Sequence, residues 1–328
     1  MASSDIQNLT ITTPYLALDT KLGEGPYWHA PTNTLRMVDI VRKHLYQIPL
    51  STPPSSPTDL SSVRKFELTH SVGTTAELAG EGEDGGGRFV FGGKAGVGVM
   101  DKGTGEWRYV ARWWGEGEGE GREEKERLFR GNDGAVDRRG RYFLGVMNDP
   151  MEGEIKNEGV VFRLDPNLSL HKILEPVAIP NGISWSLDDK HIYFTSSTDN
   201  AITKYPYDVE SGDVDFKSGE VFFKCPYEGG VPDGHARDAE GCFWIALYGV
   251  GKVVRVNEQG RILVEISLPT RCITCPAIAG EDLYITCAEE SDPDKHPESA
   301  KYQGGLFKIN IGVKGAPLNE FKPAKKLA

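Results

Sequence analysis

Four oxygen-bearing side chains recur 10 or 11 residues before four apolar segments of the chain. Glu24, Asn132, Asn181 and Asp233 lie 11, 10, 11 and 10 residues before the segments that begin at Leu35, Tyr142, Ile192 and Phe243. Each has a glycine as a near neighbour, and Asn-Gly and Asp-Gly are common in turns, so ordinary turns are the alternative interpretation. Turns need no shared register, however, and Glu24 is a poor turn former. The spacing therefore predicts a shared site.

The residue types indicate what that site would hold. Converging carboxylates repel one another and need a positive charge between them. Glu24 and Asp233 supply two carboxylates and Asn181 a neutral carbonyl oxygen, and such ligands suit hard divalent ions. Three protein ligands leave positions open for water and substrate, as in a catalytic metal site.

A repeat explains why these residues should converge. Short apolar strands that follow Gly-, Asp- or Asn-rich turns begin at Leu35, Phe89, Tyr142, Ile192, Phe243 and Leu283. A period of about 40–50 residues built from strands is the signature of a β-propeller, in which equivalent positions form a ring about one axis. The sequence predicts an all-β, six-bladed propeller with four antiparallel strands per blade. Residues 1–328 would form one domain, with blades within about 14–313 and short terminal extensions.

The connecting segments can also be predicted. Hairpin turns are expected at Asp137–Gly140, Asp238–Gly241 and Asn257–Gly260. Gly80–Gly87 and Gly115–Arg127 are rich in Gly and Glu, lack apolar residues and are expected to be surface loops. The tail beyond about Val313 is expected to pack loosely on the outside, and helices should be few.

Composition excludes several classes of partner. The formal net charge of −11 disfavours nucleic acid and anionic membranes. The N-terminus has neither a basic region nor an apolar run, so a cytoplasmic protein is expected, as monomer or homodimer. The five cysteines indicate free thiols. Cys272 and Cys275 have the spacing of half a zinc site, with buried thiols as the alternative.

No other catalytic motif competes with the predicted ring. No Gly-x-Ser-x-Gly nucleophile elbow and no phosphate-binding glycine loop is present. His235, two residues after Asp233, could shuttle protons at the same site or could be a packing histidine.

The motifs together resemble the regucalcin (senescence marker protein)/gluconolactonase/luciferin-regenerating enzyme family over residues 14–312. They are 22–28 (LGEGPYW), 130–134 (RGNDG), 180–186 (PNGISWS), 232–234 (PDG) with 238–241, and 283–288 (LYITCA). The resemblance implies a six-bladed propeller that opens a small sugar-type lactone, aided by one divalent ion: Ca²⁺, Mg²⁺, Mn²⁺ or Zn²⁺.

The resemblance also implies individual roles. Glu24, Asn181 and Asp233 correspond to the family's metal ligands, and Arg130 and Asn132 to its substrate contacts; Arg130 could instead be an exposed loop cation. The metal would polarise the lactone carbonyl, and Asp233 would take the proton of the attacking water.

One departure concerns the substrate. Relatives close to regucalcin have a sugar-contacting Glu after the third-blade strand, where this chain has Pro150; Asn148, Asp149 or Glu152 could substitute. Three alternatives therefore stay open. They are an esterase or phosphotriesterase-like metal hydrolase, a non-hydrolytic pathway enzyme, and a calcium-binding or protein-binding propeller without catalysis.

Overall fold

Short strands that reverse at tight turns build almost all of the chain into sheet. The computed structural model describes residues 6–51, 58–81, 87–115 and 121–327. Within these residues the helices are α1 (Gly121–Leu128), α2 (Pro297–Ala300), η1 (Ala30–Thr32), η2 (Leu60–Ser62) and η4 (Phe216–Ser218). The prediction of few helices is confirmed, and no described helix is long and apolar enough to cross a membrane.

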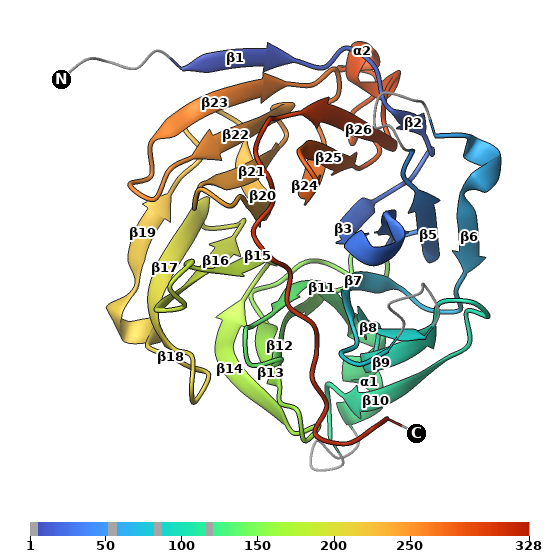
Figure 1. The fold of residues 1–328 in the computed structure, drawn as a ribbon, viewed down its shortest axis with the longest axis vertical. Helices are drawn as coiled ribbons and strands as arrows, with labels where there is room; N and C mark the ends of the chain where they lie inside the picture. Colours follow the sequence, from blue (N-terminus) through green and yellow to red (C-terminus); the bar gives the residue numbers. More distant parts are fainter. Residues whose placement is uncertain (1–5, 52–57, 82–86, 116–120, 328) are drawn as a thin grey trace.

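The strands form six sheets around a central axis (Figure 1). Blade 1 contains β3 (Gly23–His29), β4 (Thr34–Asp39), β5 (His44–Pro49) and β6 (Arg64–Glu67). Blade 2 contains β7 (Val72–Glu77), β8 (Arg88–Gly93), β9 (Gly96–Asp101) and β10 (Trp107–Arg112). Blade 3 contains β11 (Phe129–Val136), β12 (Tyr142–Asn148), β13 (Gly159–Leu164) and β14 (Leu170–Val177).

The second half of the ring follows the same plan. Blade 4 contains β15 (Pro180–Trp185), β16 (His191–Ser196), β17 (Ala201–Asp208) and β19 (Glu220–Phe223), with β18 (Asp213–Val214) on the end of β17. Blade 5 contains β20 (Val231–Arg237), β21 (Phe243–Tyr248), β22 (Lys252–Val256) and β23 (Ile262–Ser267). Blade 6 contains β24 (Ile273–Ala279), β25 (Asp282–Cys287), β26 (Gly305–Asn310) and β2 (Leu16–Ala17). The predicted six-bladed propeller of four antiparallel strands per blade is confirmed, and the six apolar segments are the second strands of the blades.

Both ends of the chain close the ring. The N-terminal β2 pairs antiparallel with β26 and completes blade 6, whose other three strands come last in the chain. Before it, β1 (Gln7–Thr10) runs parallel to β23 on the outer edge of blade 5. Strands far apart in sequence thus cover two sheet edges that would otherwise be open.

The core is divided among the interfaces between neighbouring blades. Each of the six main clusters of buried apolar side chains draws on two adjacent blades. Blades 1 and 2, for example, share Val38, Leu45, Phe89 and Phe91. A single four-stranded sheet cannot bury both of its faces, so the ring buries what separate blades would expose.

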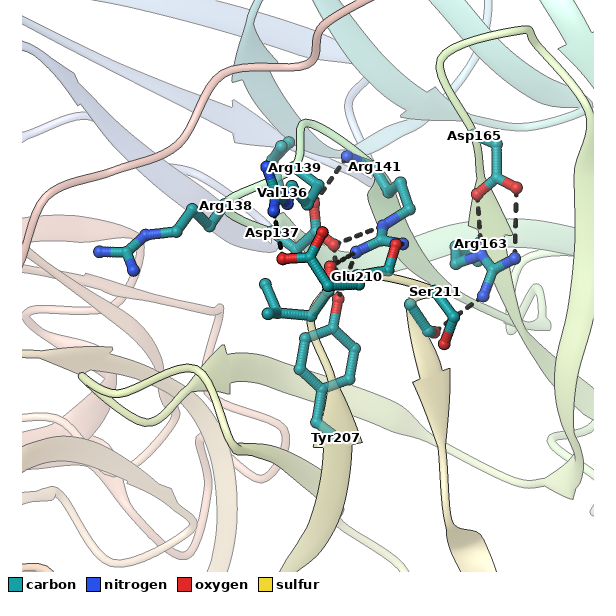
Figure 2. Close-up of polar contacts among 12 residues, drawn as sticks. Val136, Asp137, Arg138, Arg139, Arg141, Arg163, Asp165, Tyr207, Glu210 and Ser211 are labelled. Atoms are coloured by element: carbon teal, nitrogen blue, oxygen red, sulfur yellow. Dashed lines mark hydrogen bonds and ion pairs between the residues drawn. The ribbon is translucent and has the colours of Figure 1, made fainter.

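The predicted hairpins form at the three expected positions. Gly140, Gly241 and Gly260 close them with φ of 81°, 84° and 75°, which favour glycine. Asp137, which begins the first hairpin turn, is fully buried: it accepts from Arg141 Nε at 2.6 Å and from the Tyr207 hydroxyl at 2.5 Å (Figure 2). This carboxylate links blade 3 to blade 4 and has a structural role.

One predicted surface loop is partly helical. Residues 82–86 and 116–120 lie outside the described residues, but Gly121–Leu128 forms α1, so the loop prediction for 121–127 is wrong. Glu, Lys and Arg are good helix formers. An i,i+4 ion pair joins Arg122 to Glu126 at 3.1 Å and supports the helix.

The C-terminal tail is not loosely packed. Residues 314–327, called the C-terminal strap, cross the centre of the ring in Figure 1. Ala316 N donates to Arg237 O of blade 5 at 2.9 Å, and Phe321 N donates to Glu77 O of blade 2 at 2.8 Å. Phe321 is fully buried in the cluster between blades 2 and 3. A single aromatic anchor, with no periodic pattern around it, gave little sequence signal for this packing.

Candidate active site

The innermost strand of every blade has an irregularity at the same point. Pairing with the second strand shifts after Glu24, Val72, Gly131, Pro180, Pro232 and Ile273, which marks six β-bulges. A bulge redirects the side chains beside it and is common next to active sites. The ring positions at these bulges are Glu24, Gly73, Asn132, Asn181, Asp233 and Thr274.

Two of the six positions carry no free polar group. Gly73 has no side chain, and a Cβ there would lie 2.1 Å from Asn132 O, so β7 and β11 approach too closely for one. The Thr274 hydroxyl is fully buried and donates to Gly23 O at 2.6 Å. The four residues singled out from the sequence are therefore the ring positions with a functional group to offer.

Hydrogen bonds join Asn132 and Asn181 across blades 3 and 4. Asn132 Nδ2 donates to Asn181 Oδ1 at 2.7 Å and to Pro180 O at 2.8 Å. Asn181 Nδ2 donates to Ser197 Oγ at 2.8 Å. The Asn132 and Asn181 side chains are both buried, so the two amides are held as one unit.

Burial and neighbouring negative charge destabilise the charged forms of the Glu24 and Asp233 carboxylates. Burial raises the pKa of Glu24 well above its usual value, and the charges of Asp233 and Asp133 raise this pKa further. Burial and then the charge of Asp133 also raise the pKa of Asp233. Arg130 opposes both shifts without cancelling them. Buried Glu24 and Asp233 and half-buried Asp133 therefore form an electron-rich group with too little positive charge.

Asp233 Oδ1 is buried and has no hydrogen-bond partner among the described residues. An isolated carboxylate oxygen is costly to bury, because it loses its hydrogen bonds to water and gains none in the protein. Glu24 Oε2 accepts from Gly25 N at 3.0 Å. Two carboxylates and the Asn181 carbonyl oxygen fit a hard divalent ion. No group of three His, Cys, Asp or Glu side chains within the described ranges could hold a metal, so an amide would have to complete the set.

Arg130 is a buried side chain and not an exposed loop cation. Its Nη1 donates to Asn132 Oδ1 at 2.6 Å and to Gly131 O at 3.0 Å, and its Nε lies 3.9 Å from Asp149 Oδ1. Lys94 forms an ion pair with the other oxygen of Asp149. The guanidinium is thus fixed beside the ring.

The residues that could replace the family's third-blade Glu are engaged elsewhere. Asp149 pairs with Lys94, while Asn148 Oδ1 accepts from Lys156 N at 3.0 Å. Glu152 is exposed and lies 3.3 Å from Arg127. Asp149 therefore supports Arg130, and none of the three has a free carboxylate or amide directed by the described contacts to a sugar.

A cavity of about 570 Å³ lies in the channel, lined by residues that follow the ring positions along the inner strands. All six innermost strands line it, and Gly25, Asp133, His235 and Cys275 are the lining residues nearest to the ring positions along their strands. Strap residues Gly315–Glu320 also line it. The four ring side chains themselves are not part of its wall. The candidate site thus adjoins this chamber without lining it.

Two further sequence candidates have structural partners. His235 contacts Ser184 Oγ at 2.8 Å and Thr195 Oγ1 at 3.2 Å, and burial lowers its pKa to about 3. These contacts favour the packing interpretation over a proton shuttle. Cys272 and Cys275 are buried free thiols, and burial raises the pKa of Cys275 well above its usual value.

Sequence reasoning missed Asp133 and Ser197. Asp133 follows Asn132 at the bulge, lines the chamber, and has its pKa raised to about 6 by burial. An Asp-Gly pair reads as a turn, so the bulge gave no separate signal. Ser197 comes from a turn after β16, and nothing in its local sequence points to Asn181.

Comparisons with known proteins identify a matching family and similar chains. Residues 22–289 match the family described as the SMP-30/Gluconolactonase/LRE-like region. Regucalcin from Oryctolagus cuniculus is 36% identical over 197 residues, which cover 57% of this chain and 64% of regucalcin, less than two thirds of its length. An uncharacterised protein from Sulfolobus acidocaldarius is 31% identical over 302 residues, covering 90% of this chain and 94% of that protein.

Solved structures agree in fold. A calcium-binding protein, regucalcin, from Agrobacterium tumefaciens has a TM-score of 0.82 at 23% identity, covering 97% of this chain and 99% of its own. A gluconolactonase from Xanthomonas campestris has a TM-score of 0.65 at 22% identity, covering 84% and 86%. At such identities these likenesses establish the fold alone.

Proposed function

The chain belongs to the SMP-30/gluconolactonase/LRE-like family, and from this membership and its site we propose that it is a lactonase. It would use one divalent ion to open a small sugar-type lactone to the hydroxy acid. The observation that carries the proposal is the buried Asp233 Oδ1, which has no partner within the described chain and lies in an electron-rich group with Glu24. That arrangement calls for a cation.

Glu24, Asn181 and Asp233 would hold the ion. When bound, it would supply Lewis-acid polarisation of the lactone carbonyl. Asp233 would accept the proton of the water that attacks the carbonyl carbon, and the ring C–O bond would break with a proton passing to the leaving oxygen. Ca²⁺ is the first ion to test, because the ligands are all oxygen and a relative of the same fold is described as calcium-binding.

Arg130 and Asn132 would orient the substrate. Arg130 Nη1 is occupied by Asn132 Oδ1 and Gly131 O, while Nη2 donates to no residue in the described parts of the chain. Both hydrogens of Asn132 Nδ2 are used, which leaves its Oδ1 a second lone pair. The pair could therefore contact one substrate oxygen and one substrate hydroxyl, and fix the angle of attack.

A second candidate is a metal-dependent hydrolase of other esters or phosphotriesters. The observation that favours it is the third-blade loop, where Asn148, Asp149 and Glu152 are all engaged with other residues. A site without the sugar-contacting Glu lacks one side chain that could hydrogen-bond to a polyhydroxy ring.

The test is hydrolysis of a panel of sugar lactones, aryl esters and phosphotriesters, followed with a pH indicator and corrected for spontaneous reaction. Chelator-treated protein is compared with protein resupplied with Ca²⁺, Mg²⁺, Mn²⁺ or Zn²⁺. Asp233→Ala should abolish metal-dependent turnover. Asp213→Ala, which removes a carboxylate with a 79% exposed side chain, should not. Turnover of esters alone would favour the second candidate, and no turnover at all would refute both.

A further inference from the structure

Ser197 links Asn181, one of the residues proposed to hold the ion, to Pro232, the residue directly before another, Asp233. It begins the turn that follows β16 in blade 4 and is 5% exposed. Its hydroxyl accepts from Asn181 Nδ2 at 2.8 Å and donates to Pro232 O of blade 5 at 2.7 Å. Pro232 directly precedes Asp233, so one hydroxyl contacts both strands at the bulges.

These contacts define the orientation of the Asn181 amide. A serine hydroxyl has one hydrogen, and here Pro232 O receives it, so Ser197 Oγ can only accept from Asn181. It therefore requires the NH₂ end of the amide. On the other side, Asn132 Nδ2 donates to Asn181 Oδ1 at 2.7 Å and requires the oxygen end.

A flipped Asn181 amide would break both contacts. Its NH₂ would face the NH₂ of Asn132, and its oxygen would face Ser197 Oγ, whose hydrogen is already donated. Leaving such buried groups unpaired is unfavourable. In the observed orientation the Asn181 oxygen keeps one lone pair free, and that lone pair is what a cation needs.

We propose that Ser197 is a positioning residue that holds the Asn181 carbonyl oxygen toward the ion and ties it to the strand of Asp233. The inference rests on the proposed function, because it presumes a divalent ion at Glu24, Asn181 and Asp233. Groups that orient metal ligands typically change metal affinity about 10- to 100-fold when they are removed. Ser197 should therefore matter for affinity more than for folding.

The experiment measures binding of CaCl₂ to the chelator-treated full-length protein by isothermal titration calorimetry, together with its melting temperature. Ser197→Ala should weaken the Ca²⁺ Kd about 10- to 100-fold. Ser197→Thr keeps the hydroxyl and should restore most of the affinity. Ser186→Ala is the matched control, since Ser186 is also a buried blade-4 serine with local hydrogen bonds, at the opposite end of β16. It should leave the Kd unchanged.

The outcomes separate this inference from the proposed function. If the wild-type protein binds none of Ca²⁺, Mg²⁺, Mn²⁺ and Zn²⁺, the metal-dependent function fails and this inference with it. If the wild type binds Ca²⁺ and folded Ser197→Ala binds it equally well, only the role of Ser197 is overturned. Should Ser197→Ala not fold, Ser197→Cys carries the test, because its thiol is a poor acceptor of similar shape; an unchanged Kd would again overturn the role.

Discussion

Phe321 is expected to anchor the C-terminal strap, and its replacement by alanine tests this packing. The side chain is fully buried in the cluster shared by blades 2 and 3. The backbone bonds from Phe321 N to Glu77 O and from Ala79 N to Phe321 O do not involve the ring and can persist in the variant. The variant therefore measures mainly the aromatic side chain.

The expected loss is about 3–5 kcal/mol, the usual cost of a buried Phe→Ala change with its residual cavity. An unfolding entropy of about 2.1 cal/mol/K per residue over this chain makes 1 kcal/mol worth about 1.5 °C, so the melting temperature should fall by about 4–7 °C. Differential scanning calorimetry would measure it.

Leu318→Ala is the matched control, because Leu318 lies on the same strap and is 55% exposed. Its effect should stay within about 0.5 kcal/mol. If the two variants melt alike, or if Phe321→Ala shifts the melting temperature by less than about 1 °C, the strap does not stabilise the ring and the packing argument is wrong.

Three further predictions concern charge. Asp233→Asn removes one buried repelling carboxylate, so the variant should melt above the wild type in chelator yet gain nothing from Ca²⁺; a lower melting temperature in chelator would contradict the repulsion. Arg130→Lys should lower kcat/KM for the lactone about 10- to 150-fold, the value of one charged hydrogen bond of about 1.5–3 kcal/mol, with the Ca²⁺ Kd unchanged; steady-state kinetics and calorimetry test this, and full activity would exclude Arg130 from substrate binding. Burial against Phe91 and Trp107 lowers the pKa of His70 to about 4. Because the unfolded value is about 6.5, this neutral histidine favours folding above pH 6.5 and its contribution is lost as pH falls to 4, by up to about 3 kcal/mol. Urea unfolding at about pH 7.5 and 4.5 should show that the free energy of unfolding falls less for His70→Phe than for the wild type. Equal decreases would contradict the role of His70.

The sequence was sufficient to predict the second strand of every blade, and therefore the six-bladed ring. Segments such as Phe243–Tyr248 are buried on both faces, so they are apolar throughout and stand out between glycine turns. The spacing of 10 or 11 residues before these strands was enough to predict that Glu24, Asn132, Asn181 and Asp233 take similar positions on the inner strands.

Features that depend on contacts between blades could not be predicted. Each bulge adds one residue to an inner strand, and no particular residue type marks the position of that extra residue in the sequence. Ser197 reaches Asn181 and Pro232 from a turn, through contacts that exist only when blades 4 and 5 pack together. The packing of the strap depends on Phe321, which is buried in the apolar cluster between blades 2 and 3. Asp149 could be read as a substrate contact until its ion pair with Lys94 was seen.

The way in which the ring closes also affects how the protein can be made. Strands β1 and β2 are the first to leave the ribosome, but their partners β23 and β26 span residues Ile262–Ser267 and Gly305–Asn310. During translation the first strands must therefore stay unpaired while blades 1 to 4 are synthesised. The growing chain exposes a sheet edge and an uncovered blade face until β23 and β26 emerge, a state prone to association between chains. Low temperature and slow expression should therefore raise the soluble yield.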